Sequence, residues 1–179
     1  MNIITRVENS KKSDVFIYNV NMSDTITIIL CSDNHSYEAP LQYLKQAYPE
    51  ADYFLHCGDC ELPKRMMEGY ACVQGNNDHY GDFPPHLILH IGEHHIYLTH
   101  GHRDMMFNQY EMLAAKAKAN GCDIACCGHT HMPFAKVIDG VTCLNPGSIW
   151  HNRDGSSPTY MILTLNGPEI SWEKKVYKM

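Results

Sequence analysis

The sequence predicts an α/β protein in which two sheets pack face to face with helices on the outside. Strand and helix patterns alternate over residues 25–73, which is typical of a parallel sheet covered by helices. Residues 87–177 instead contain strand pairs joined by short turns, which is typical of antiparallel pairing. The length of 179 residues suits roughly one domain.

The parallel half begins with Thr-Ile-Thr-Ile-Ile-Leu at residues 25–30, a β-branched apolar run that predicts a buried strand. A helix over 38–48 follows, because Leu41, Leu44 and Tyr48 recur at helical spacing. The other elements expected in this half are a strand at 53–55, a short helix at 61–69 and a strand at 71–73.

The second half is expected to be mostly antiparallel. Gly92-Glu93 and Asp139-Gly140 are turn dipeptides between apolar runs, and each predicts a hairpin. An Ala- and Lys-rich helix over 107–119 ends at Asn120-Gly121, a typical C-cap. The strands expected in this half are 87–89, 95–98, 124–127, 134–138, 141–144, 159–165 and 170–177.

The first residues differ from the rest, so we predict a single domain at 24–179 preceded by an extension at 1–23. Residues 8–14 are polar, and a second methionine, Met22, lies just before the first strong strand. The extension is therefore a flexible segment, the product of an upstream start site, or an added strand built on residues 15–18. The sequence does not decide among these alternatives.

Composition excludes several classes of function. The net charge of −6 and the absence of a basic run argue against a nucleic-acid-binding face. No apolar stretch approaches the roughly 20 residues of a membrane span, and the N-terminus lacks the features of a signal peptide. We therefore expect a cytoplasmic protein whose eight cysteines are reduced thiols. Exposed sheet edges would also allow a homodimer.

Side chains that bind metals follow five of the predicted strands. Each segment alone is typical of a polar turn, but the carboxyl ends of strands share one edge of an α/β sheet, where ligands bind. We therefore expect the five segments to converge. They are Asp33-Asn34-His35, Gly58-Asp59, Gly75-Asn76-Asn77-Asp78, His100-Gly101-His102 and His129-Thr130-His131.

Oxygen ligands mixed with imidazole suit manganese, iron, zinc or nickel. The segments offer seven ligands, which are too many for one tetrahedral ion. They suit two ions that share a carboxylate and lie about 3.5–4 Å apart. The sequence therefore predicts a dinuclear site.

In this order, the five segments resemble the motifs of calcineurin-like metallophosphoesterases, and the short chain with Asn145-Pro146-Gly147-Ser148 resembles the small YfcE-type phosphodiesterase branch. The resemblance implies a four-layer α/β/β/α sandwich and two divalent ions, with manganese expected before nickel, iron or zinc. It implies hydrolysis of a small phosphoester, most of all a phosphodiester, by a hydroxide that bridges the ions. The implied ligands are Asp33, His35 and His131 for one ion, Asn76, His100 and His129 for the other, and Asp59 as the bridge.

One position departs from the pattern of larger relatives, which carry histidine where this chain has Asn77. An amide cannot transfer a proton near neutral pH, so hydrolysis of esters with poor leaving groups is in doubt. Asn77 and His102 are the two catalytic candidates, and His102 is the candidate for that proton transfer, or it only orients the site. Arg153, after the Asn-Pro-Gly-Ser segment, is a candidate for holding a phosphate oxygen.

Two other functions fit parts of the pattern. A relative of this branch, a retromer subunit, uses the same sandwich as a protein-interaction scaffold with a degraded site, and fold alone does not establish activity. A structural zinc protein would need thiolates paired with the histidine motifs, and that spacing is not found. All seven ligand positions are filled, which favours the enzyme.

Overall fold

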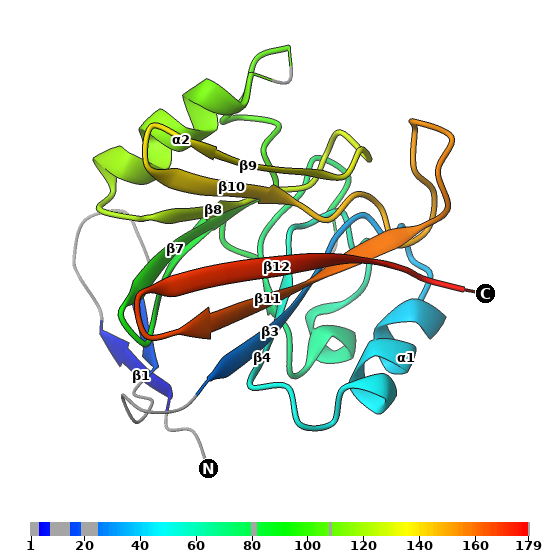
Figure 1. Ribbon diagram of the computed structural model, residues 1–179. Coiled ribbons are helices and arrows are strands. Elements are labelled where there is room, and N and C mark those ends of the chain that lie inside the picture. The colour runs from blue at the N-terminus through cyan, green and yellow to red at the C-terminus, as the bar shows by residue number, and fades with distance from the viewer. Residues whose placement is uncertain (1–3, 8–14, 19–24, 80–81, 108, 179) are drawn as a thin grey trace.

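The computed structural model describes residues 4–7, 15–18, 25–79, 82–107 and 109–178. Two mixed sheets face each other, helix α1 (Ala39–Ala47) covers one of them, and helix α2 (Tyr110–Ala119) covers the other (Figure 1). The predicted four-layer α/β/β/α sandwich is therefore confirmed. No helix in the described part of the chain is long and apolar enough to cross a membrane.

The first sheet has five strands in the order β12-β11-β3-β4-β5. Strands β3, β4 and β5 are parallel, so their carboxyl ends lie at one edge, while β11 and β12 pair antiparallel. The strands are β3 (Ile26–Cys31), β4 (Tyr53–His56), β5 (Ala71–Cys72), β11 (Thr159–Asn166) and β12 (Glu169–Val176).

The second sheet has seven strands in the order β1-β2-β6-β7-β8-β10-β9. Strand β2 runs parallel to β6, so residues 15–18 form the added strand that was one of the three alternatives. Both predicted hairpin turns join paired strands. The strands are β1 (Ile4–Val7), β2 (Val15–Tyr18), β6 (His86–Ile91), β7 (His94–Thr99), β8 (Ile124–Cys126), β9 (Phe134–Ile138) and β10 (Val141–Asn145).

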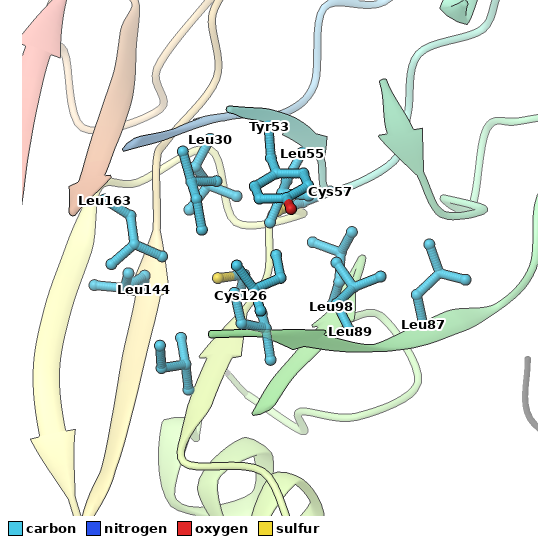
Figure 2. Packing of buried hydrophobic residues seen from close by; sticks show 14 of the residues in the cluster. Leu30, Tyr53, Leu55, Cys57, Leu87, Leu89, Leu98, Cys126, Leu144 and Leu163 are labelled. Carbon is cyan, nitrogen blue, oxygen red and sulfur yellow. The ribbon is translucent and has the colours of Figure 1, made fainter. Parts of the chain in front are cut away.

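Successive side chains of a strand point to opposite faces of the sheet, and this alternation produces the layers of the fold. Leu30 and Leu55 point between the sheets and pack with Leu89 and Leu98 from the opposite sheet (Figure 2). The neighbouring residue Ile29 points outward and packs with α1. Because both faces of β3 are buried, its sequence is a continuous apolar run rather than an alternating one.

The helix predicted at 61–69 is wrong. Only one 3-10 turn forms, η1 (Lys64–Met67), and it starts directly after Pro63. Glu68 is extended (φ −57°, ψ 130°), so the turn cannot continue. The Tyr70 hydroxyl then donates to the Leu41 carbonyl at 2.8 Å and ties the segment to α1. This tertiary contact competes successfully with helix formation in so short a segment.

Candidate metal centre

The loops after β3, β4, β7 and β8 meet at one edge of the sandwich. Backbone hydrogen bonds connect them, from Asp33 N–H to the Gly58 carbonyl at 3.1 Å and from Gly128 N–H to the His100 carbonyl at 3.0 Å. Five of the seven predicted ligands have a left-handed backbone, with φ between 44° and 66°, namely Asp33, His35, Asp59, His129 and His131. Residues in this sparsely populated region are concentrated at functional sites.

Asp33, His35 and His131 form the first cluster of ligand atoms. His131 Nε2 lies 3.2 Å from Asp33 Oδ1 and 3.2 Å from His35 Nε2. The other ring nitrogens are already engaged, since His35 Nδ1 lies 2.6 Å from the Glu61 carboxylate and His131 Nδ1 donates to the His151 carbonyl at 2.9 Å. Such partners fix the ring orientation of metal-binding histidines.

The second cluster is formed by Asp33, Asp59 and His100. His100 Nδ1 donates to the Cys57 carbonyl at 2.7 Å, so in the neutral ring Nε2 carries a lone pair. That lone pair faces two oxygens, Asn76 Oδ1 at 3.0 Å and Asp59 Oδ2 at 3.5 Å. Asn76 Oδ1 therefore lies beside this cluster, and its role as a ligand stays a prediction.

The donor set fits divalent cations. In both clusters lone pairs point at one another, and this arrangement is repulsive unless a proton or a cation lies among them. Asp33 Oδ1 is buried and faces His131 Nε2 at 3.2 Å. Carboxylate, amide and imidazole ligands together suit first-row transition metals. In this geometry both clusters share Asp33, and the bridging role of Asp59 stays a prediction.

The clusters shift the pKa values of their own members. Burial alone would raise the pKa of Asp33, but the hydrogen bond with His131 and the charge of His100 lower it. Burial would lower the pKa of His131, but the hydrogen bond and charge of Asp33 raise it. His100 behaves similarly, because its contact with Asp59 outweighs burial and raises its pKa. Without metal, these histidines therefore attract protons to the site.

The remaining predicted residues lie around these clusters. The His129 ring centroid is 5.1 Å from that of His100, and its backbone N–H donates to Asp33 Oδ2 at 3.2 Å. The His102 ring is 5.3 Å from the His100 ring, and burial first and the charge of His100 second lower its pKa. Arg153 is exposed at the rim, where its Nη1 lies 3.5 Å from the His129 carbonyl.

Asn77 contacts a predicted ligand directly. Its backbone N–H donates to Asp59 Oδ1 at 2.8 Å, and its side-chain Nδ2 donates to Asp59 Oδ2 at 2.7 Å. Burial would raise the pKa of Asp59, but the contacts with His100 and Asn77 lower it. The residue proposed as a catalytic candidate thus holds the Asp59 carboxylate in its ionised form.

Two acidic residues contribute in ways that sequence reasoning did not predict. Asp78 is buried, and its carboxylate accepts the backbone N–H groups of Asp59 at 2.8 Å, Gly75 at 2.7 Å and Glu61 at 2.7 Å. Glu61 in turn holds His35. The sequence signal for Asp78 was its place in the Gly-Asn-x-Asp segment, but two of its three partners, Asp59 and Glu61, come from a different loop.

Glycine is required where the loops approach most closely. A Cβ added at Gly75 would lie 2.0 Å from Asp59 Oδ1, and one added at Gly128 would lie 2.6 Å from Asp33 Oδ2. Neither distance is compatible with the present carboxylate positions. The two glycines therefore let the backbone approach the carboxylates.

Known proteins share these features. Residues 26–167 match the family described as Calcineurin-like phosphoesterase superfamily domain. The chain is 38% identical over 147 residues to "Probable metallophosphoesterase YsnB" of Bacillus subtilis, which covers 78% of this chain and 85% of YsnB. It is 30% identical over 152 residues to "Probable metallophosphoesterase MG207" of Mycoplasma genitalium, which covers 82% and 91%.

Solved structures agree. A predicted phosphoesterase from Streptococcus pneumoniae superposes with a TM-score of 0.79 at 28% identity and covers 86% of this chain and 90% of its own. Vps29 of Entamoeba histolytica in complex with Zn²⁺ shares the fold, with a TM-score of 0.69 at 23% identity over 83% of this chain and 91% of its own. An archaeal phosphodiesterase also shares the fold, with a TM-score of 0.68 at 21% identity over 85% of this chain and 100% of its own. The fold, the clustered Asp and His ligands and these relatives lead to one assignment: the chain belongs to the calcineurin-like phosphoesterase superfamily, in its branch of small metallophosphoesterases with YsnB.

Proposed function

We propose that this metallophosphoesterase is a phosphodiesterase that works with two divalent ions, manganese first among them. The observation that carries the proposal is the clustering of ring nitrogens of His35, His100 and His131 with carboxylate oxygens of Asp33 and Asp59. Such ions, when bound, neutralise phosphate charge and lower the pKa of a coordinated water.

Side chains around the ligand clusters have separate roles in orienting the ligands, holding the substrate and transferring a proton. Asn77 orients Asp59 through its two donated hydrogen bonds, and Glu61 orients His35. Arg153 stands at the rim beside His129, where a guanidinium can hold a phosphate oxygen. The His102 ring lies 5.3 Å from the His100 ring, and burial and the charge of His100 lower its pKa, which favours the neutral ring. A neutral imidazole accepts a proton, so His102 is suited to take one from the attacking water and not to protonate the leaving group.

The preference for a diester is supported by an archaeal phosphodiesterase that shares the fold. At the position where larger relatives carry a histidine this chain has Asn77, which favours esters, diesters and monoesters alike, whose leaving group departs without much proton assistance. The expected homodimer and cytoplasmic location stay predictions.

The test is a paired measurement of metal and turnover. The protein is purified without chelator, its metal content is measured, and hydrolysis of bis-p-nitrophenyl phosphate is followed with and without Mn²⁺. Asp59→Ala is compared with Asp82→Asn, a change at an exposed carboxylate. We expect about two ions per chain in wild type, Mn²⁺-stimulated hydrolysis, and loss of both only in Asp59→Ala. Bound metal without turnover of any phosphoester would instead support the scaffold function.

A further inference from the structure

Trp150 is an exposed aromatic side chain beside the metal centre. Its indole is 48% exposed, and its ring centroid lies 5.6 Å from that of His35. It sits in the loop that joins β10 and β11, the orange loop of Figure 1. Tryptophan is usually largely buried, so a half-exposed indole next to a predicted ligand needs an explanation.

The backbone that carries this indole is fixed to the site. Ser148 Oγ donates to the Asp33 carbonyl at 2.7 Å and accepts the N–H groups of Trp150 at 3.1 Å and His151 at 2.8 Å. On the other side of Trp150, Arg153 N–H donates to the His131 carbonyl at 2.9 Å. The loop is therefore bonded to the backbone of two predicted metal ligands.

Buried Asn152 locks the same loop from within. Its Oδ1 accepts the Ser148 N–H at 2.7 Å, and its Nδ2 donates to the Ser157 carbonyl at 2.7 Å and to Thr159 Oγ1 at 3.0 Å. A rigid loop that presents an exposed indole is preorganised, so little conformational entropy is lost when a flat group stacks on it.

We propose that Trp150 determines specificity by stacking against a planar aromatic group on one ester arm of the substrate, so that the substrate class is a small phosphodiester with a nucleoside arm. This inference rests on the proposed phosphodiesterase function. A ribose separates phosphate from base, and this arrangement matches a phosphate at the ligand clusters with the base on the indole beside His35. Stacking of a base on an aromatic side chain strengthens binding about tenfold or more.

The first test isolates the base. Binding of adenosine 5′-monophosphate and of ribose 5-phosphate to the Mn²⁺-loaded protein is measured by calorimetry, in wild type and in Trp150→Ala. Phosphorus NMR confirms that each ligand stays intact. We expect wild type to bind the nucleotide at least about tenfold more tightly, and Trp150→Ala to lose that difference while its affinity for ribose 5-phosphate is unchanged. Equal binding of the two ligands by wild type would overturn the inference.

Phenyl phosphate distinguishes the source of the aromatic group. Binding as tight as that of the nucleotide would mean that any aryl arm suffices, and would overturn the nucleoside assignment. Weaker binding would support it.

The second test measures the fluorescence of the Trp150 indole. The chain has two tryptophans, and Trp172 lies on the edge strand β12. In Trp172→Phe, Trp150 is the only tryptophan, and we expect the nucleotide to quench its fluorescence while ribose 5-phosphate does not. Trp150→Phe keeps only Trp172 and is the matched control, which should not respond. Quenching in the control alone would overturn the inference.

Neither readout needs turnover. If wild type hydrolyses bis-p-nitrophenyl phosphate but shows no nucleotide preference, the inference fails and the phosphodiesterase proposal stands. If the nucleotide preference depends on Trp150 but no phosphoester is hydrolysed, the catalytic proposal fails and the binding site stands.

Discussion

The Nε2 atoms of His35 and His131 face each other at 3.2 Å, and the Nδ1 atom of each ring is held by an oxygen acceptor, Glu61 for one and the His151 carbonyl for the other. Two neutral rings in this arrangement would point lone pairs at each other. Either a proton or a cation must therefore lie between them.

This relationship predicts that metal binding releases protons. In the metal-free protein, contacts with Asp59 and Asp33 outweigh burial and raise the pKa values of His100 and His131, so these rings bind protons more readily than a free imidazole. The apparent metal affinity should therefore fall as pH falls through these pKa values. Calorimetric titration with Mn²⁺ in buffers of different ionisation enthalpy measures the released protons. An enthalpy that does not depend on the buffer would contradict the prediction.

Asn77→Leu should weaken metal binding more than it slows the loaded enzyme. The substitution removes the 2.7 Å hydrogen bond to Asp59 Oδ2 but keeps the backbone bond to Oδ1. A hydrogen bond to a charged group contributes about 1.5–3 kcal/mol, so we expect the Mn²⁺ concentration for half-maximal activity to rise about tenfold or more. Activity as a function of Mn²⁺ concentration is the measurement, with Asn166→Ala at an exposed strand end as the control. If kcat at saturating Mn²⁺ falls and the Mn²⁺ requirement stays the same, Asn77 acts on the reaction instead.

Gly75→Ala should disturb the site through steric overlap alone. The new Cβ would lie 2.0 Å from Asp59 Oδ1, and we expect a loss of about 1–3 kcal/mol in the free energy of unfolding together with lower metal content. Gly155→Ala is the control, because its φ of 79° strains alanine but nothing lies within 4 Å of the new Cβ. It should cost about 1–2 kcal/mol and leave metal content unchanged. Thermal unfolding and metal analysis compare the two, and full metal content in Gly75→Ala would refute the steric argument.

His56 should make stability depend on pH. Burial lowers its pKa from 6.5 to about 4, its Nδ1 accepts the Gly58 N–H at 3.2 Å, and its Nε2 has no partner in the described part of the chain. Between pH 4 and pH 6.5 the unfolded chain binds a proton at the His56 ring and the folded protein does not. Stability contributed by the neutral ring is therefore complete above pH 6.5 and is lost as pH falls toward 4, by up to about 1.4 kcal/mol per pH unit.

The measurement is urea unfolding of wild type and His56→Gln at several pH values. The wild-type free energy of unfolding should fall relative to that of the variant between pH 6.5 and 4.5. A difference that stays constant over this range would show that His56 does not titrate as described.

Much of the fold could be predicted because local patterns carry it. The β-branched run at 25–30 and the turn at Asp139-Gly140 specify their elements without help from the rest of the chain. The segment at 61–69 could not be predicted correctly, since Pro63, extended Glu68 and the distant Leu41 carbonyl decide its shape. Strand β2 stayed one of three alternatives because its parallel partner β6 is about 70 residues away in the chain.

The candidate site could likewise be predicted only in part from the sequence. The ligand types were readable because each follows a strand whose carboxyl end lies at a common edge. The side chains that hold the ligands were not readable, because Asp78 and Glu61 act across loops and only tertiary structure brings them to Asp59 and His35. Trp150 was likewise missed, since an indole after an Asn-Pro-Gly-Ser segment gives no signal until its exposure is known.

The left-handed backbone at the ligand positions couples the chemistry of the site to its geometry. Apart from glycine, the residues that best tolerate such a backbone are asparagine, aspartate and histidine. These are also oxygen and imidazole ligands. Cys57, Cys60 and Cys127 lie next to the same loops, but they are buried and do not have a left-handed backbone. A left-handed backbone at the ligand positions therefore disfavours cysteine there, and with it thiolate coordination. A related chain that bound soft metal ions would need a different loop conformation as well as different ligands.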